Sequence, residues 1–273
     1  MTNTPLIKLD NLYLKREDKN ITGSTKDRVI PLQIEKLKKN GFSQAVISST
    51  GNAAISAAYF CQQKQVELTI FLSPNVSPQK LAVLKQFPSE IILSLKPISS
   101  AIKYAKTNNA YLLRQSTDPV SLVGYQQISE EIQNQLSHVT SIFVPIGSGT
   151  TLLGISQKIP ANIPIFGIQS AANCPISSLF DQDYQKENRL ITDALSVKYL
   201  PQKKQIIETI KNSQGFAFTI QNEAIVLANH FLESKNIVTS LEGALCLAGY
   251  QKAVKNNYSV GKYPVILLTG SKR

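Results

Sequence analysis

The chain has 273 residues, and its 29 Lys or Arg against 18 Asp or Glu give a formal net charge of +11. Hydrophobic residues make up 42% and charged residues 17%, which excludes a disordered chain, and three cysteines are too few for a disulfide scaffold. No apolar run approaches the roughly 20 residues of a membrane span, and the N-terminus lacks the basic and apolar parts of a signal peptide. We therefore expect a cytoplasmic globular protein of one or two domains with no membrane partner.

The positive charge is spread over a lysine-rich chain and is not gathered into one basic patch. Only five of the basic residues are Arg, and the only adjacent lysine pairs are Lys38-Lys39 and Lys203-Lys204. Nucleic-acid recognition favours arginine forks and clustered basic faces. We therefore expect no nucleic-acid partner and a solvated surface that attracts anionic ligands only modestly.

Short apolar runs alternate with helical segments along almost the whole chain. Strands are predicted over residues 45–48, 68–72, 91–93, 111–113, 141–144, 163–168, 236–238 and 265–268. Helices are predicted over residues 53–62, 77–85, 99–106, 123–136, 221–233 and 241–255. Residues 180–188 are expected to form a surface loop, and 203–212 a loop or short helix. Continuous apolar runs between helices are typical of parallel strands covered on both faces, so we predict an α/β fold with open, mostly parallel sheets.

Ligands in such folds gather where strands end and helices begin, and three of these junctions are unusual. The first is residues 23–28, Gly-Ser-Thr-Lys-Asp-Arg, where a helix is predicted to begin near Ser24 or Thr25. On residue types alone, the simpler interpretation is an N-cap at Ser24 with a solvated Lys26. The functional interpretation is a lysine placed for imine chemistry, which needs support from elsewhere in the chain.

The second junction is residues 48–53, between a predicted strand and a predicted helix. Its candidate binding residues are Ser49, Thr50, Gly51 and Asn52. Hydroxyl, amide and backbone N–H donors at the positive end of a helix can bind a carboxylate. A turn capped by Thr50 or Asn52 explains the same residues equally well.

The third junction is a glycine-rich loop that follows the strand predicted over 141–144. Its candidate residues are Gly147, Ser148, Gly149, Thr150 and Thr151. Glycines let backbone N–H groups approach a phosphate closely, so we favour a phosphate-binding loop over a tight packing turn. It is neither a Walker loop nor a dinucleotide fingerprint, because no Lys-Ser/Thr pair follows the glycines and Leu152 stands where a third glycine belongs.

Taken together and in this order, the three junctions resemble fold type II of the pyridoxal-phosphate enzymes, the tryptophan synthase β-subunit-like fold. The resemblance runs from Thr4 to Gly270 and includes residues 15–18, which look like the "KRED" stretch of threonine synthases and dehydratases. Residues 20–28 resemble the motif N-P-T-G-S-F-K-D-R, although Ile21 and Thr25 depart from it. By this resemblance the cofactor is pyridoxal 5′-phosphate and Lys26 is the lysine that holds it as a Schiff base.

The resemblance also assigns roles to the other junctions. It implies that Asn52 contacts the cofactor's 3′-hydroxyl, that residues 49–52 bind the substrate carboxylate, and that residues 147–151 hold the cofactor phosphate. Thr269, with Ser271 as second choice, matches the hydroxyl that faces the pyridine nitrogen. A hydroxyl there would leave the ring unprotonated and make it a weaker electron sink, which suits elimination and replacement reactions.

The resemblance implies two open, mostly parallel three-layer domains. The smaller domain, residues 41–124, would be inserted into a larger cofactor-binding domain of residues 1–40 and 125–273. Closure of the smaller domain on a bound substrate would exclude water. The family also suggests a homodimer.

The implied activity is a lyase of amino-acid biosynthesis acting on a small amino acid by β/γ-elimination or replacement. The pair after Lys26 favours threonine synthase or cysteine synthase over dehydratase. Residues 118–132 resemble a stretch of threonine synthases, but Ser121, Gln126 and Gln127 replace its Arg, Lys and Thr. Residues 191–195 and 241–244 look at least as much like dehydratases. We therefore rank threonine synthase-like chemistry first, serine/threonine ammonia-lyase second and cysteine synthase third. A catalytically silent homologue that only binds the cofactor is the alternative from a different class.

The sequence lacks the residue patterns of a metal site and of a hydrolase triad. The three cysteines are isolated, only two histidines occur, and no Gly-x-Ser-x-Gly elbow is present. We therefore expect no metal.

Overall fold

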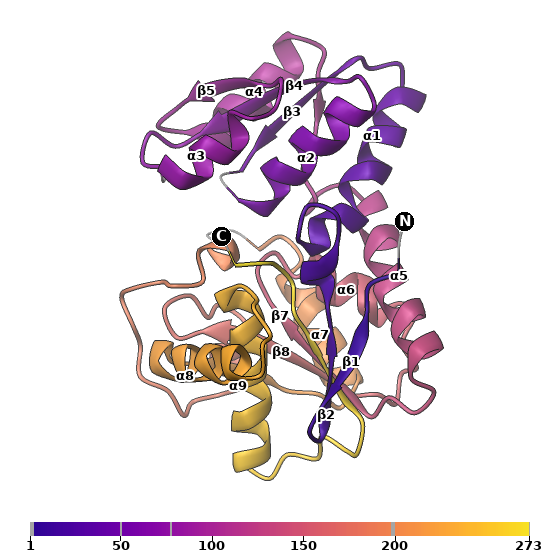
Figure 1. Cartoon of the computed structure of the whole chain (residues 1–273), viewed down its shortest axis with the longest axis vertical. Helices are drawn as coiled ribbons and strands as arrows, with labels where there is room; N and C mark the ends of the chain where they lie inside the picture. The colour runs from indigo at the N-terminus through magenta and orange to yellow at the C-terminus, as the bar shows by residue number, and fades with distance from the viewer. Residues whose placement is uncertain (1–2, 50, 77, 198–199, 273) are drawn as a thin grey trace. The chain divides into compact units, whose positions relative to one another are not determined.

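The structure is a computed structural model that describes residues 3–49, 51–76, 78–197 and 200–272 (Figure 1). The chain forms two compact units: a larger unit of Met1–Thr25 with Tyr125–Arg273, and a smaller unit of Lys26–Gly124. The sequence placed the first boundary near Gly41. The structure includes α1 (Ile30–Lys39) in the smaller unit, because its buried face joins the apolar core beneath that unit's sheet.

The described part of the larger unit contains a six-stranded sheet with the strand order β1-β2-β10-β7-β8-β9. Its strands are β1 (Leu6–Leu9), β2 (Leu12–Lys15), β7 (Ser141–Pro145), β8 (Ile165–Ser170), β9 (Ala217–Ile220) and β10 (Pro264–Leu267). Among these described strands, only the β1–β2 pair is antiparallel, and the other neighbours run parallel. The predicted α/β fold with mostly parallel sheets is confirmed in this unit.

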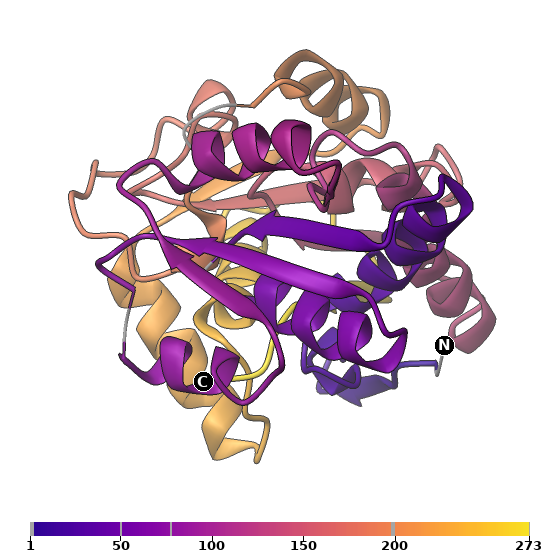
Figure 2. The same cartoon turned by 90° about the horizontal axis from the view of Figure 1, so that it is seen from above.

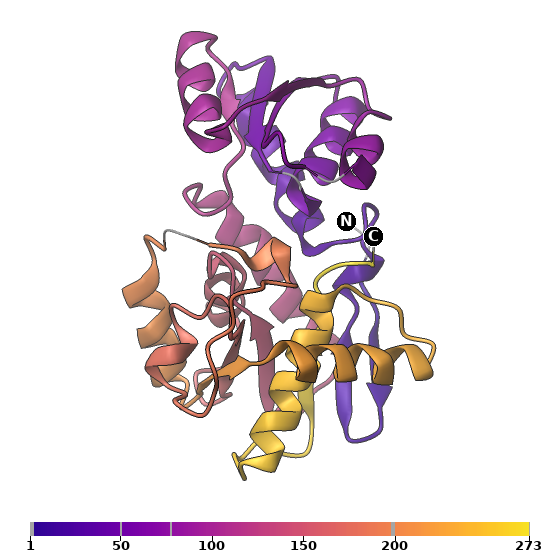
Figure 3. The ribbon, with the colours of Figure 1, turned by 90° about the vertical axis from the view of Figure 1, so that its left-hand side faces the viewer.

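Helices cover both faces of the larger sheet. They are α6 (Thr150–Ser156), α7 (Lys203–Asn212), α8 (Asn222–Ser234) and α9 (Leu241–Lys255), with most of α5 (Val120–Gln135). Neighbouring residues of β8 show the two faces, because successive side chains of a strand point to opposite sides. Gly167 packs toward Ile210 of α7, whereas Ile168 packs against Gly249 of α9. Figure 3 shows α8 lying across α9.

In the larger unit, one local prediction is wrong and one element was missed. Residues 236–238 form no strand: Asn236 adopts a positive φ of 59° and Ile237 N–H donates to Leu232 O, which closes the end of α8. The β1–β2 hairpin was not predicted. Its signal was present as a two-residue Asp10-Asn11 turn, with a positive φ at Asp10, between two short alternating runs.

The described part of the smaller unit contains a four-stranded parallel sheet with the order β5-β4-β3-β6. Its strands are β3 (Gln44–Ser48), β4 (Glu67–Leu72), β5 (Glu90–Leu93) and β6 (Tyr111–Leu112). The remaining helices are α2 (Asn52–Gln63), α3 (Pro78–Leu84) and α4 (Pro97–Thr107). Figure 2 shows α4 on one side of this sheet and α2 with α3 on the other, so the unit has three layers.

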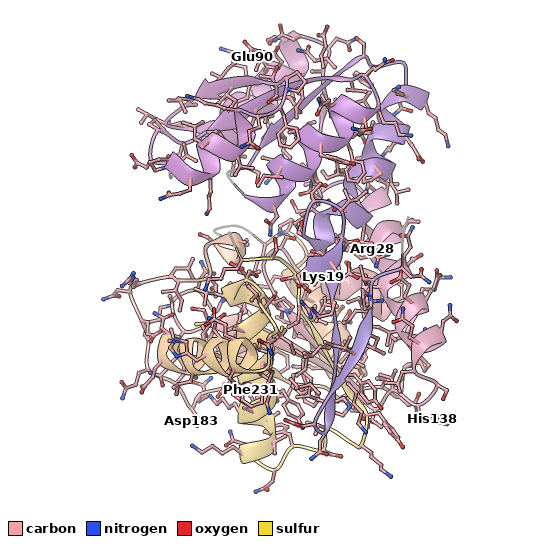
Figure 4. The ribbon with its side chains drawn as sticks, viewed as in Figure 1. Lys19, Arg28, Glu90, His138, Asp183 and Phe231 are labelled. Atoms are coloured by element: carbon pink, nitrogen blue, oxygen red, sulfur yellow. The ribbon has the colours of Figure 1, made fainter. Side chains whose placement is uncertain are left out.

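A polar cluster on the outer edge of the smaller sheet includes Glu90, at the start of β5 (Figure 4). Thr69 Oγ1 of β4 donates to Glu90 Oε2 at 3.0 Å and lies 3.2 Å from the Tyr104 hydroxyl of α4. This cluster fastens α4 to the sheet through side chains. No helix in the described part of the chain is long and apolar enough to cross a membrane.

Asp118, just before α5, connects α1 and β6 of the smaller unit through its side chain. It accepts hydrogen bonds from Lys36 Nζ at 2.8 Å, Tyr111 OH at 2.6 Å and Gln33 Nε2 at 3.1 Å. Burial alone would raise the pKa of Asp118, but the hydrogen bonds from Lys36, Tyr111 and Gln33 outweigh burial and lower it. The pKa of Tyr111 is raised, mainly by burial and then by its hydrogen bond to Asp118.

We expect this cluster to make stability depend on pH in acid. The folded state holds the carboxylate with a pKa below the unfolded value of about 3.9, so its stabilising effect is complete above about pH 4. That effect is lost as pH falls through the folded-state pKa. Urea unfolding of wild type and Asp118→Asn should therefore differ most at neutral pH and converge in acid. Asp183→Asn is the matched control, because the side chain of Asp183 is 88% exposed. An equal pH response in both variants would contradict the expectation.

Candidate cofactor site

The glycine-rich loop of residues 147–151 lies where β7 ends and α6 begins. Gly149 is the N-cap of α6 and has a positive φ of 82°, a conformation that glycine adopts without strain. Ser148 Oγ and Thr150 Oγ1 are 3.0 Å apart. No side chain of the described residues caps the first turn of α6. The loop therefore presents two hydroxyls and backbone N–H donors at a helix start, which is a suitable donor set for a phosphate.

Packing also requires these glycines to be small. A Cβ on Gly149 would lie 2.1 Å from Ile206 Cδ1 of α7, and one on Gly147 would lie 3.3 Å from Leu195 Cδ2. The tight-turn interpretation from the sequence therefore has a physical basis too. The two interpretations do not exclude each other, because packing fixes the backbone whose N–H groups would bind the anion.

Residues 269–271 follow β10 and lie beside the start of the lysine motif. Thr25 N–H donates to Thr269 O at 3.0 Å, and Ser271 N–H donates to Gly23 O at 2.8 Å. Ser24 and Gly270 form a β-bridge between these contacts. The larger unit thus places Thr269 and Ser271 next to the residues that lead directly into Lys26.

Lys26 lies in a short 3₁₀ turn and not in the first turn of the predicted helix. Thr25–Arg28 form a 3₁₀ turn, and α1 begins only at Ile30, with Pro31 in its first turn. Val29 N–H donates to Lys26 O at 3.0 Å. The side chain of Lys26 is partly buried.

Asp27 connects this turn to the second junction within the smaller unit. Its carboxylate is buried and accepts a hydrogen bond from Ser56 Oγ of α2 at 2.7 Å. Helix α2 begins at Asn52. This hydrogen bond therefore connects the residue after Lys26 to the helix that begins with Asn52, one of the predicted carboxylate-binding residues.

The second junction is partly described. Thr50 lies outside the described residues, while Ser49, Gly51 and Asn52 are partly buried. Gly51 is the N-cap residue of α2, and Asn52 is the first residue of the helix. No side chain of the described residues forms a capping hydrogen bond at this end of the helix. Ser49 Oγ instead accepts Gly51 N–H at 3.3 Å. This leaves the Asn52 amide outside the capping role that the sequence had left open.

A further link in the larger unit was not assigned a role from sequence. The carboxylate of Glu242, in the first turn of α9, accepts Ala194 N–H at 3.3 Å. The neighbouring Leu195 packs against Gly147. Residues 191–195 and 241–244 both looked like dehydratase segments, and the structure connects them next to the glycine-rich loop.

The "KRED" stretch forms a buried polar network that supports the lysine motif. Lys15 Nζ is fully buried and lies 2.6 Å from Glu131 Oε2 and 2.7 Å from Thr4 O. Glu17 accepts hydrogen bonds from Thr4 Oγ1 at 2.5 Å and from Asn20 Nδ2 at 2.8 Å. These contacts hold the segment that runs into Gly23.

The family model described as "Pyridoxal-phosphate dependent enzyme" matches residues 1–270. The chain belongs to this family. This confirms the fold type II resemblance and the cofactor, pyridoxal phosphate.

Relatives and solved structures agree with the family. The chain is 27% identical to a catabolic L-threonine dehydratase of Staphylococcus aureus (98% of this chain, 83% of the relative). It is 24% identical to a biosynthetic L-threonine dehydratase of Haemophilus influenzae, covering 96% of this chain but about half, 53%, of that enzyme. Maize serine racemase has a TM-score of 0.88 at 18% identity (100% of this chain, 89% of that one). Tomato threonine deaminase isoform 2 has a TM-score of 0.84 at 18% identity, covering 100% of this chain and 80% of that one. At these identities the two structures show a shared fold.

The residues of this family member fit pyridoxal phosphate by the chemistry of their donors. The loop of residues 147–151 supplies hydroxyl and glycine N–H donors for a phosphate, Lys26 supplies an amine, and Thr269 supplies a hydroxyl at the end of β10. Among the described residues, no group of three His, Cys, Asp or Glu side chains could hold a metal ion.

Proposed function

We propose that this enzyme removes the β-hydroxyl of serine or threonine and releases ammonia and a keto acid. The sequence ranked threonine synthase-like chemistry above this ammonia-lyase. The order is reversed here because curated relatives that match nearly the whole chain are threonine dehydratases. The proposal also agrees with the dehydratase-like segments that meet at Glu242 and Ala194.

A feature of this chain that supports the same choice is the absence of charge at two positions that are basic in threonine synthases by the resemblance. Ser121 is fully buried, and its Oγ has no hydrogen-bond partner in the described structure. Gln126 Nε2 donates to Gln157 Oε1 at 2.6 Å. Neither side chain carries a charge for a phosphorylated substrate, whereas serine and threonine need none there.

When bound, the cofactor supplies the electron sink that stabilises negative charge at the substrate's α-carbon. Lys26 would hold the cofactor, and its amine would take the α-proton of the bound substrate as a general base. The donors of residues 49–52 would orient the substrate carboxylate, and Asn52 would also bind the cofactor's 3′-hydroxyl. Residues 147–151 would hold the phosphate. The hydroxyl of Thr269, with Ser271 as the second candidate, would bind the ring nitrogen.

The test is a comparison of substrates on one preparation of protein with pyridoxal phosphate. L-threonine, L-serine, O-phosphohomoserine and O-acetylserine are supplied separately, and keto acid, ammonia and inorganic phosphate are measured. We expect keto acid and ammonia in equal amounts from threonine or serine. Release of phosphate from phosphohomoserine with formation of threonine would instead support the threonine synthase reaction.

The silent-homologue alternative has a separate readout. Exchange of the α-proton of an added amino acid in deuterium oxide, followed by proton NMR, detects the first step even without net turnover. Exchange in wild type and its absence in Lys26→Ala would support an active enzyme. No exchange with any of the four compounds would favour a protein that only binds the cofactor.

A further inference from the structure

Gln169, in β8, is a buried glutamine whose side chain uses both ends of its amide. It is 1% exposed. Its Oε1 accepts N–H groups of Ile176 and Ser177, each at 2.9 Å, and its Nε2 donates to Ile146 O at 3.2 Å. Burying an amide is costly unless its groups are paired, and an apolar side chain of similar size would avoid that cost. The importance of Gln169 therefore lies in the groups that it holds.

The carbonyl of Ile146 is the last backbone group before the glycine-rich loop. The N–H of Ile146 already donates to Ile168 O at 2.8 Å. Consecutive residues of β8 thus hold both polar backbone groups of Ile146, one through the backbone and the other through the side chain of Gln169. Gly147 and Gly149 follow, and glycine peptides are conformationally permissive. A fixed Ile146 limits where the loop's N–H groups can lie.

We propose that Gln169 is a positioning residue for the cofactor phosphate, acting through the carbonyl of Ile146 on residues 147–151. This inference rests on the proposed role of that loop in holding the phosphate. A phosphate held by several N–H groups is sensitive to displacement of the backbone that carries them. Loss of the Gln169–Ile146 hydrogen bond should weaken cofactor binding without removing any group that contacts the cofactor.

Gln169→Glu separates the two ends of the amide. The new side chain has the same shape and still accepts from Ile176 and Ser177, but its ionised form cannot donate to Ile146 O. We expect the dissociation constant for pyridoxal phosphate, measured by absorbance titration of apoprotein, to rise about tenfold. Affinity for pyridoxal, which lacks the phosphate, should not change relative to wild type.

A pH series adds a readout that general damage would not produce. The introduced carboxyl group regains an O–H donor when it is protonated. The ratio of variant to wild-type dissociation constants should therefore fall toward one as pH decreases. Gln169→Leu, which has no donor at any pH, should show a ratio that does not recover.

Two controls separate the possible failures. Thr219→Val removes the 2.7 Å contact between Thr219 Oγ1 and Ser177 Oγ, so it loosens the same segment without touching Ile146, and it should leave cofactor affinity unchanged. Thr150→Val tests the loop directly and should weaken pyridoxal phosphate binding.

The outcomes are distinct. If Thr150→Val weakens binding but Gln169→Glu does not, or if Gln169→Glu weakens pyridoxal and pyridoxal phosphate equally, the positioning role is overturned while the loop assignment stands. If Thr150→Val leaves the affinity unchanged, the phosphate role of the loop fails, and the inference about Gln169 fails with it.

Discussion

Lys26→Ala should reduce turnover of threonine or serine at least about 100-fold, because general-base catalysis alone contributes about 10²–10⁴-fold and this lysine also anchors the cofactor. The variant should also lose the visible absorption of lysine-bound cofactor. Its far-UV circular dichroism should match wild type, since the turn is held through Asp27 and through the backbone of Val29.

Lys19→Ala is the matched control for this prediction. Lys19 lies seven positions earlier in the same segment, is exposed (Figure 4), and ends the short 3₁₀ turn Glu17–Lys19. Its removal should leave both absorption and turnover within about twofold of wild type, because surface substitutions usually change the free energy of unfolding by no more than about 0.5 kcal/mol. Equal activity in the Lys26 and Lys19 variants would remove Lys26 from the mechanism.

Glu131→Gln should lower the free energy of unfolding by about 3–5 kcal/mol, because it removes a carboxylate that pairs with the buried Lys15. The Lys15 and Glu131 side chains are 0% and 9% exposed, with 2.6 Å between Nζ and Oε2. The adjacent Glu130 offers a matched control. It pairs with Lys158 at 3.6 Å, but both side chains are about half exposed, so Glu130→Gln should cost at most about 1 kcal/mol.

Urea unfolding at pH 7 gives both values. The comparison is informative because the two glutamates are neighbours on one helix and receive the same isosteric substitution. Similar losses in the two variants would show that the buried network does not stabilise the fold as its burial and distances indicate.

The sequence predicted those parts of the fold in which a local pattern agrees with tertiary structure. Residues 241–255 were predicted as a helix and form α9 with the same ends, because an apolar face and a polar start are local signals. The predicted strand 236–238 fails because Asn236 can adopt the left-handed conformation that ends α8, and an apolar run does not reveal this. Lys26 was predicted to lie in a regular helix, but Thr25–Arg28 form a 3₁₀ turn. The first residue of this turn, Thr25, donates its N–H to Thr269 O, a contact that the local sequence does not reveal.

The candidate site could be predicted only as separate motifs. Residues 20–28, 49–52 and 147–151 each carry a local signature, and their order along the chain pointed to the family. Contacts between distant residues left no such signal. Gln169 reaches Ile146, 23 positions earlier, and Ala194 reaches Glu242, 48 positions later. Sequence spacing says nothing about such pairs until the strands and helices are placed.

The most direct test of the account is to find which lysine carries the cofactor. Protein loaded with pyridoxal phosphate is reduced with borohydride, digested, and examined by mass spectrometry for the peptide that gains the phosphopyridoxyl group. We predict that the group is on Lys26 alone and that Lys26→Ala treated in the same way carries none there. A group on another lysine, or no labelled peptide from protein saturated with the cofactor, would contradict the assignment of Lys26 and the mechanism built on it.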